Sequence, residues 1–181
     1  MSPVPRFVER PDELNSLLSK LPLMPCAHCG RYGNLIGHGL LRGYAERSSD
    51  TVVRGRRVLC SDRGRKRGCG RTVSTLLTRF VERCTVVAAT LWVLFGGLAD
   101  GLSVERAAEK AKFPLDVRSA YRVSFRLKKQ TLAWRSWLTS RVTAPESAAQ
   151  QPLVQLREHL IVAAGPKPFE QREFRCATRL L

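Results

Sequence analysis

The chain is 181 residues long, enough for one domain of ordinary size or for two small ones. Its 44% hydrophobic and 25% charged residues are typical of a folded globular protein and exclude wholesale disorder. Lys and Arg number 31 against 15 Asp and Glu, a formal net charge of +16. Such a surface favours nucleic acid as the partner, with an anionic membrane or a solvated surface without a specific partner as the alternatives.

The N-terminus and the apolar runs bear on where the protein works. Residues 1–15 have no apolar core and carry acidic residues early, unlike a secretory signal. The longest apolar run, residues 85–95, is much shorter than the ~20 residues that cross a bilayer. Six cysteines without an export signal favour reduced thiols. We therefore expect a cytoplasmic, nucleoid-associated protein that binds no membrane.

Residues 1–23 are predicted to be an N-terminal segment with one short amphipathic helix. Pro11, Asp12 and Glu13 are typical of a helix start. The leucines that follow recur with helical spacing: Leu14, Leu17, Leu18 and Leu21. We expect this helix to pack on the part of the chain that comes next.

Residues 24–82 change character and are predicted to form a small zinc ribbon of short antiparallel strands. Glycine is frequent there, and helical periodicity disappears. Short strands are expected at residues 35–39, 51–53 and 56–59, with a polar hairpin loop at residues 47–50.

Two pairs of cysteines indicate a metal site in this region. Cys26 and Cys29 are separated by two residues and followed by Gly30, a spacing that brings two thiolates to one tetrahedral ion. Cys60 and Cys69 form a second pair with eight residues between them. We predict that the four thiolates hold one structural Zn²⁺ per chain. Zinc would supply much of the folding free energy of so small a ribbon. Because four thiolates fill its coordination positions, the ion would have no open position for a catalytic water.

Other interpretations of the cysteines stay open from the sequence. Separate buried thiols would act as small hydrophobic groups, although this leaves the Cys-x-x-Cys spacing unexplained. A redox motif would open a helix in a βαβ unit, which the surrounding sequence does not predict. His28 and His38 are alternative ligands, while Cys84 and Cys176 are expected to be spare thiols.

Residues 83–141 are predicted to form a helical, helix-turn-helix-like domain. An apolar helix is expected at residues 85–98, ended by Gly96, Gly97 and Gly101. The overall fold class is therefore α+β, a zinc ribbon followed by a helical region.

The second part of this domain has the proportions of a helix-turn-helix. Ser103 is expected to cap a short helix, and Pro114 interrupts the helical pattern. Asp116 then caps a longer helix that continues to about residue 141.

The remaining chain, residues 142–181, is predicted to be a linker and C-terminal tail. The linker is expected at residues 145–152, a weaker helix at residues 154–163, and the last residues are ambiguous between helix and coil.

Two basic surfaces are candidates for nucleic-acid binding. The first surrounds the second cysteine pair and comprises Arg54, Arg56, Arg57, Arg63, Arg65, Lys66, Arg67 and Arg71. The second is one arc of the longer helix, with Arg118, Arg122, Arg126 and Lys129 opposite an apolar arc of Ala120, Val123, Leu127, Trp134 and Leu138. In a helix-turn-helix the start of this helix enters the major groove, so Arg118, Ser119 and Arg122 are the candidate base-reading residues. A solvated loop and a plain amphipathic helix are the alternatives.

Four segments of the chain resemble the zinc-ribbon and helix-turn-helix regions at the front of bacterial insertion-sequence transposases and of small stand-alone relatives. They are CAHCG at residues 26–30, IGHGLLRGYAE at 36–46, RGRRVLCSDRGRKRGCGRTVS at 54–74 and GLSVERAAEKA at 101–111. The resemblance covers about residues 24–135. It implies that the ribbon and the helices bind the terminal DNA of a mobile element.

The end of the chain departs from that pattern. In such transposases a separate RNase-H-like domain cuts and joins strands with acidic residues and Mg²⁺. Here the last residues hold Glu146, Glu158, Glu170 and Glu173 and no Asp, which is too little for such a domain. We expect no enzymatic activity, and transposition would need a separate catalytic subunit.

The sequence therefore predicts a zinc-stabilised duplex-DNA-binding protein, transposase-associated or similar to a transcription regulator, with a homodimer left open. The alternative is an RNA- or ribosome-associated zinc-ribbon protein, in which the same loop reads phosphates and shape. A metal nuclease or thiol oxidoreductase lacks an Asp/Glu/His cluster. A protein-binding adaptor is compatible with the apolar helix.

Overall fold

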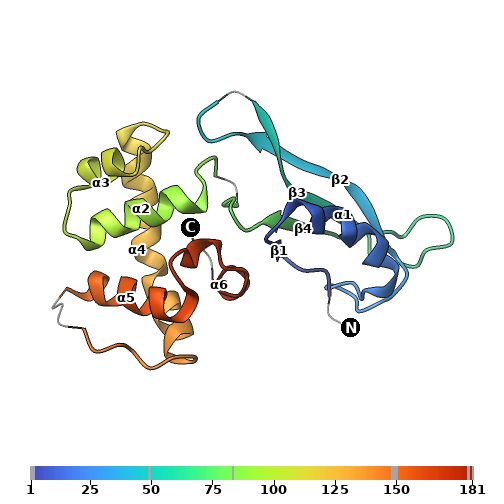
Figure 1. Ribbon diagram of the computed structural model, residues 1–181. Coiled ribbons are helices and arrows are strands. Elements are labelled where there is room, and N and C mark those ends of the chain that lie inside the picture. The colour runs from blue at the N-terminus through green and yellow to red at the C-terminus, as the bar shows by residue number, and fades with distance from the viewer. Residues whose placement is uncertain (1–2, 49, 83, 148–150, 179, 181) are drawn as a thin grey trace. The chain divides into compact units, whose positions relative to one another are not determined.

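The computed structural model describes residues 3–48, 50–82, 84–147, 151–178 and 180. The chain divides into two compact units, Met1–Leu77 and Thr78–Leu181. The described residues form a four-stranded mixed sheet and six α-helices, an α+β architecture (Figure 1). In chain order the elements are β1 (Phe7–Val8), α1 (Pro11–Lys20), the 3₁₀ helix η1 (Leu21–Leu23), β2 (Leu35–Tyr44), β3 (Thr51–Cys60), β4 (Thr72–Leu77), α2 (Ala88–Ala99), α3 (Val104–Lys110), α4 (Val117–Thr139), α5 (Pro152–Ala164), the 3₁₀ helix η2 (Pro168–Glu170) and α6 (Arg172–Ala177).

The sheet of the first unit has the order β1-β4-β3-β2. β3 pairs antiparallel with both β2 and β4, whereas β1 pairs parallel with β4, so the sheet is mixed. The backbone N–H of Leu76 donates to the carbonyl of Arg6 (3.0 Å), and the Thr75 hydroxyl donates to the carbonyl of Pro5 (2.7 Å). The N-terminal segment therefore belongs to the same sheet as the cysteine region.

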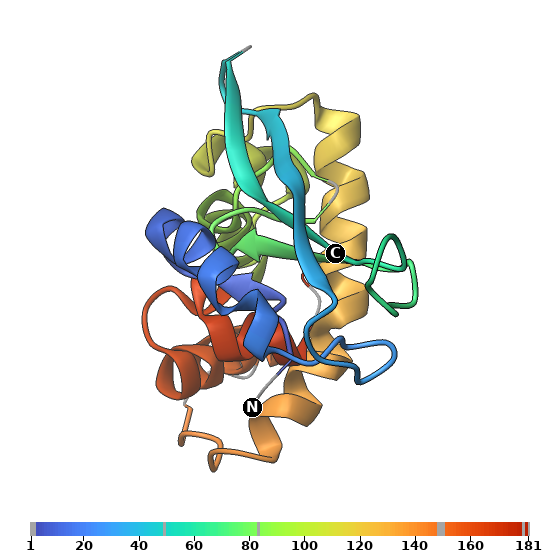
Figure 2. The ribbon, with the colours of Figure 1, turned by 90° about the vertical axis from the view of Figure 1, so that its right-hand side faces the viewer.

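Strands β2 and β3 are longer than the short strands expected from the sequence, at ten residues each. Strand β2 continues through Gly37, Gly39 and Gly43, and its register with β3 shifts between Gly37 and Leu40 and again between Leu41 and Arg42. Only the inner half of β3, Gly55 to Leu59, also pairs with β4, so the outer half of the hairpin is a two-stranded ribbon (Figure 2). The expected hairpin loop includes Ser49, which lies outside the described residues.

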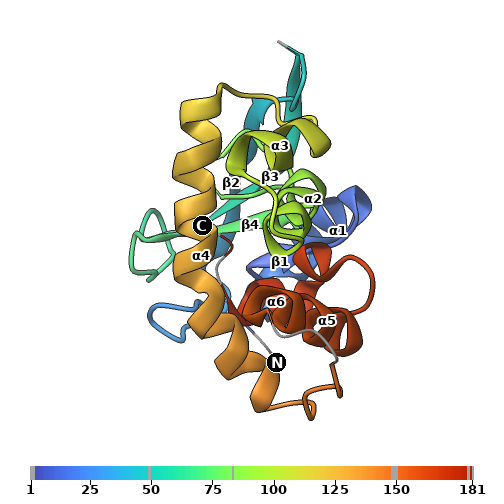
Figure 3. The ribbon, with the colours of Figure 1, turned by 90° about the vertical axis from the view of Figure 1, so that its left-hand side faces the viewer.

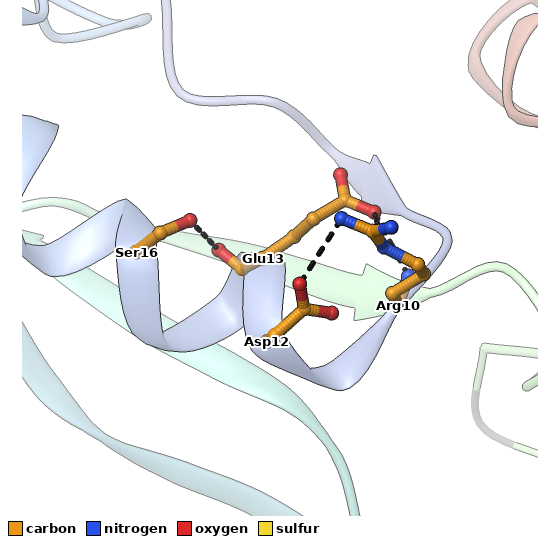
Figure 4. Close-up of polar contacts among 4 residues, drawn as sticks. All are labelled: Arg10, Asp12, Glu13 and Ser16. Atoms are coloured by element: carbon orange, nitrogen blue, oxygen red, sulfur yellow. Dashed lines mark hydrogen bonds and ion pairs between the residues drawn. The ribbon is translucent and has the colours of Figure 1, made fainter.

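Helix α1 confirms the helix predicted for the N-terminal segment. The backbone N–H of Arg10 donates to Glu13 Oε1 (3.0 Å), which satisfies one donor ahead of the first turn (Figure 4). The Arg10 guanidinium also donates to Asp12 (3.0 Å), and the Ser16 hydroxyl donates to the carbonyl of Glu13 (3.2 Å). The buried face of α1 joins a small core of Val4, Leu17, Leu21, Cys26, Leu35, Val58 and Cys60.

The second unit begins with a turn that the sequence did not predict. Helix α2 starts at Ala88 and not near residue 85, because Val87 forms an antiparallel bridge with Phe80. The run Thr85, Val86, Val87 is β-branched, which favours extended backbone over helix.

The expected end of this helix also needs correction. Gly96 and Gly97 lie inside α2, and the helix ends at Ala99. A Cβ on Gly97 would lie 2.9 Å from the Cβ of Ala107, so this glycine allows α3 to pack closely against α2. Gly101, with φ +79°, occupies the left-handed conformation just after the helix, as expected.

The caps of the next two helices are as the sequence predicted. The Ser103 hydroxyl accepts from the backbone N–H of Arg106 (3.3 Å) at the start of α3. The Asp116 carboxylate accepts from the backbone N–H of Ser119 (2.7 Å) at the start of α4. Between the helices, Lys112 has φ +48°, and the N–H of Phe113 donates to the carbonyl of Ala108 (2.9 Å).

The C-terminal residues are part of the core of the second unit. Phe169 and Phe174 are fully buried against Trp134, with ring centroids 5.0 and 6.0 Å from it. The buried Arg175 guanidinium donates to the carbonyls of Thr78 (2.8 Å) and Phe80 (3.0 Å). Figure 3 shows α4 with the shorter helices of this unit beside it. The predicted tail thus contributes core residues; the linker residues 148–150 lie outside the described part of the chain.

No helix among the described residues is both long and apolar enough to cross a membrane.

Candidate metal centre and basic surfaces

The four predicted ligands come together at one point of the first unit. The ligand atoms of Cys26, Cys29, Cys60 and Cys69 all lie within 4.8 Å of one another. Cys26 and Cys60 are buried, Cys29 is half-buried and Cys69 is exposed. Neither His28 nor His38 belongs to this cluster of four cysteines, which lies entirely within the described residues.

Two of the distances between the sulfurs are those of a tetrahedral site and not of a disulfide. Four sulfurs at a Zn–S distance of about 2.3 Å occupy the corners of a tetrahedron with edges of about 3.8 Å. The Sγ atoms of Cys26 and Cys69 are 3.8 Å apart, and so are those of Cys29 and Cys60. Bonded sulfurs would be about 2.05 Å apart. All six cysteines, each within the described residues, are free thiols.

The two cysteine pairs are built on the same backbone pattern despite their different spacing. In the first pair, the N–H of Cys26 donates to the carbonyl of Arg31 (3.0 Å), and the N–H of Gly30 donates back to Cys26 (2.9 Å). In the second pair, the same two bonds join Cys60 to Arg71 (2.9 Å) and Gly70 to Cys60 (2.9 Å).

The glycine after each pair has the same conformation, with φ +71° at Gly30 and φ +69° at Gly70. Both are left-handed, which favours glycine at this position. The second pair is thus a second copy of the first knuckle, into which a loop has been inserted.

The inserted loop, residues 61–68, is closed at its base by a backbone hydrogen bond next to the two cysteines. The N–H of Gly68 donates to the carbonyl of Ser61 (2.7 Å), and a Cβ on Gly68 would lie 2.2 Å from that oxygen. A larger residue would therefore open the base of the loop. The N–H of Ser61 in turn donates to the carbonyl of Asn34 (2.8 Å), which fixes the base of the loop to the segment just before β2.

The thiols ionise unequally in the absence of metal. Burial opposes ionisation of Cys26, but N–H donors of His28 and Cys29 and the neighbouring thiols outweigh it and lower its pKa to about 7. Burial raises the pKa of Cys60 to about 12, with further increases from the adjacent thiols, and the N–H of Cys69 only partly offsets this. The Cys26 thiolate therefore forms readily, and its negative charge disfavours ionisation of a second thiol. A divalent cation would offset this repulsion between thiolates.

The basic residues between Cys60 and Cys69 fall into two groups. Arg63, Arg65 and Arg67 are exposed. Lys66 is half-buried and its Nζ donates to the carbonyl of Gly33 (2.6 Å), so it holds the loop to the turn between the first knuckle and β2. The loop thus presents arginines to solvent while its backbone is tied down.

The basic residues before Cys60 lie on strand β3 and not in the loop. Arg57 is exposed, whereas Arg54 and Arg56 are half-buried. The Arg56 guanidinium donates to Asn15 of α1 (3.4 Å), and the side chain of Arg54 covers Gly43 of the neighbouring strand. Two of the predicted contact residues are therefore used partly inside the first unit. Arg71 is exposed and directly precedes β4.

Helix α4 carries the second predicted basic surface. Arg118, Arg122, Arg126 and Lys129 are all exposed, and Ser119 is half-buried. The predicted apolar arc is buried in full: Ala120, Val123, Leu127, Trp134 and Leu138.

Two features of these surfaces were missed in the sequence. Arg31 is exposed and donates to the carbonyl of Arg67, so it braces the loop. Arg31 lies two residues after Cys29, as Arg71 lies two residues after Cys69. This shared position in the sequence could have added Arg31 to the predicted basic surface. Helix α4 also carries exposed apolar side chains at Val117, Tyr121 and Phe125. Their four-residue spacing is visible in the sequence and indicates one shared helix face.

No protein-family model, curated protein or solved structure matches this chain.

Proposed function

We propose that this protein is a zinc-stabilised duplex-DNA-binding protein, transposase-associated or similar to a transcription regulator. It contacts DNA through the arginine-rich loop at its metal centre and through the basic face of α4. The observation that carries the proposal is the loop itself, in which Arg63, Arg65 and Arg67 project from a backbone that is tied at both ends to a four-thiol cluster.

Zinc is the metal that best suits the donor set. Four thiolates at tetrahedral spacing match a closed structural zinc site, in which all coordination positions are filled by protein. The bound ion has no position for an activated water, so its role is to hold the fold, and we assign the chain no catalytic step.

The tied loop lowers the cost of binding a polyanion. Side chains on a mobile loop lose conformational entropy when they are ordered by a partner, and a preorganised backbone reduces this loss. Arginine also forks onto phosphate oxygens and guanine edges.

Helices α3 and α4 supply the second contact as a helix-turn-helix. Their capped starts and the short connection between them have the proportions of that motif, whose second helix enters the major groove. In this arrangement Arg118, Ser119 and Arg122 lie near base edges, and Arg126 and Lys129 lie near phosphates.

The salt dependence of binding tests the proposal. Affinity for a duplex DNA, measured by fluorescence anisotropy, should fall steeply as salt rises, because each neutralised phosphate releases counterions. Replacing Arg63, Arg65 and Arg67 together by alanine should reduce the slope of log K against log salt by about 0.9 for each lost contact.

A variant with the same charge change provides the control. Lys20, Lys167 and Arg172 are also exposed, and replacing them together by alanine should change the slope much less. Equal slopes in the loop variant and the wild type would refute the loop as a contact. Tighter binding to a structured RNA than to duplex DNA in direct competition would instead favour the RNA- or ribosome-associated alternative.

A further inference from the structure

We infer that α4 reads thymine methyl groups in the major groove, through an apolar stripe of Val117, Tyr121 and Phe125 beside its arginines. The inference rests on the proposed function and adds a base preference to it. Val117, Tyr121 and Phe125 are 52%, 48% and 60% exposed. They recur every four residues and therefore share one face of the helix.

Two of these side chains contact neighbouring polar groups. The Tyr121 hydroxyl donates to Glu105 of α3, which fixes the ring against the preceding helix. The Lys129 ammonium lies 4.6 Å from the centroid of the Phe125 ring and covers part of it. The stripe is thus a preorganised apolar surface.

The charges beside the stripe identify its occupant. Residues 117–139 contain six cations and no Asp or Glu, and Arg118, Arg122 and Arg126 each follow directly after one residue of the stripe. The acids at this end of the helix already have partners within the unit: Asp116 accepts from the backbone N–H of Ser119, and Glu105 accepts from the Tyr121 hydroxyl. A second copy of this chain would bring these arginines against one another, and like charges at an interface are costly. The occupant must therefore offer anionic groups close to small apolar ones.

Duplex DNA meets both requirements in its major groove. Phosphates line the groove, and each A·T pair presents the 5-methyl group of thymine, a known partner of apolar side chains such as Phe. Val117, Tyr121 and Phe125 lie at the start of α4, the part of a second helix that enters the groove. The arrangement predicts a site in which thymines lie next to guanines contacted by arginine.

Replacing thymine by uracil isolates the methyl group, because the two bases differ only there. A duplex is first selected by the full-length protein from a randomised pool, and then remade with uracil at every thymine. Affinity at constant salt should fall about fourfold for each methyl group that the stripe buries.

Variants show which side chains carry the effect. Val117→Ala and Phe125→Ala should bring the thymine-to-uracil affinity ratio toward one, whereas Arg122→Ala should weaken both complexes alike. Leu132→Ala is the matched control, since Leu132 is 76% exposed on the same helix but about 10 Å farther along the axis from Phe125. It should keep the wild-type ratio.

The outcomes separate this inference from the proposed function. Equal affinity for the thymine and uracil duplexes, or a ratio that survives in Val117→Ala and Phe125→Ala, overturns the inference while DNA binding stands. Failure to bind any duplex, with binding to an acidic helical peptide abolished by Phe125→Ala, overturns both.

Discussion

The two units of this chain reach a stable fold by different means. In the first unit, the core beside the sheet is small and two of its members, Cys26 and Cys60, belong to the thiol cluster. In the second, Trp134, Phe95, Phe169 and Phe174 pack ring against ring at the centre of a larger hydrophobic core. Under the proposed function, a zinc ion bound by these thiols supplies in the first unit the stabilisation that aromatic burial supplies in the second.

Removal of the proposed zinc should produce the largest difference between the units. A structural zinc contributes about 10–16 kcal/mol of apparent binding free energy near pH 7, comparable with or above the whole stability of a typical domain. Chelation of the metal, or Cys69→Ser, should therefore unfold residues 3–77. Amide hydrogen exchange should show protection lost there and kept in α2, α4 and α5.

Cys176→Ser is the control for this experiment, because Cys176 is exposed and outside the cluster. It should leave both the zinc content and the exchange pattern unchanged. A first unit that stays protected after its zinc has been removed would contradict the account of its stability.

A cavity in the aromatic core should give the opposite pattern, with a smaller effect. Trp134 is fully buried, so Trp134→Ala should reduce the free energy of unfolding of the second unit by about 3–5 kcal/mol. Circular dichroism during denaturant unfolding would measure this change, and metal analysis should find the zinc content unaltered. Leu132→Ala, on the exposed side of the same helix, should stay within about 0.5 kcal/mol of the wild type. Loss of zinc from Trp134→Ala would show that the units are not stabilised separately.

The smallest effect should come from an ion pair in the second unit. Burial tends to raise the pKa of Asp100, but hydrogen bonds from Arg157 and Lys110 outweigh it and hold the pKa below its usual value. Because the folded pKa is depressed, the stabilisation is complete above about pH 3.9 and is lost as the pH falls through the folded value.

Asp100→Asn should therefore cost no more than about 1 kcal/mol at pH 7, since the pair is partly solvent-screened. The difference from the wild type should narrow in acid. Thermal unfolding at pH 7 and in acid measures the difference in stability between the variant and the wild type. A difference that grows as the pH falls would contradict the expected pH dependence.

Local signals in the sequence were enough to predict the thiol cluster and the caps of the later helices. The spacing of Cys26 and Cys29 and the side chains of Ser103 and Asp116 act within a few residues of chain, where sequence patterns are most informative. The buried arc of α4 followed from helical periodicity for the same reason.

Features that depend on distant contacts were not predicted. β1 is only two residues long and is defined by its parallel pairing with β4, in which Phe7 lies opposite Leu76. The final helix, α6, has no strong pattern of its own and is held by the burial of Phe174 and Arg175. The long hairpin was predicted as separate short strands, whereas two register shifts let β2 and β3 pair over most of their length.

The closure between Ser61 and Gly68 has a consequence for how this surface can change over time. Since the loop is shut at its base, mutations at its tip alter the charge shown to a partner without moving the sulfurs. Binding preference can therefore drift independently of metal affinity, and the segment is a natural place to graft a different recognition sequence.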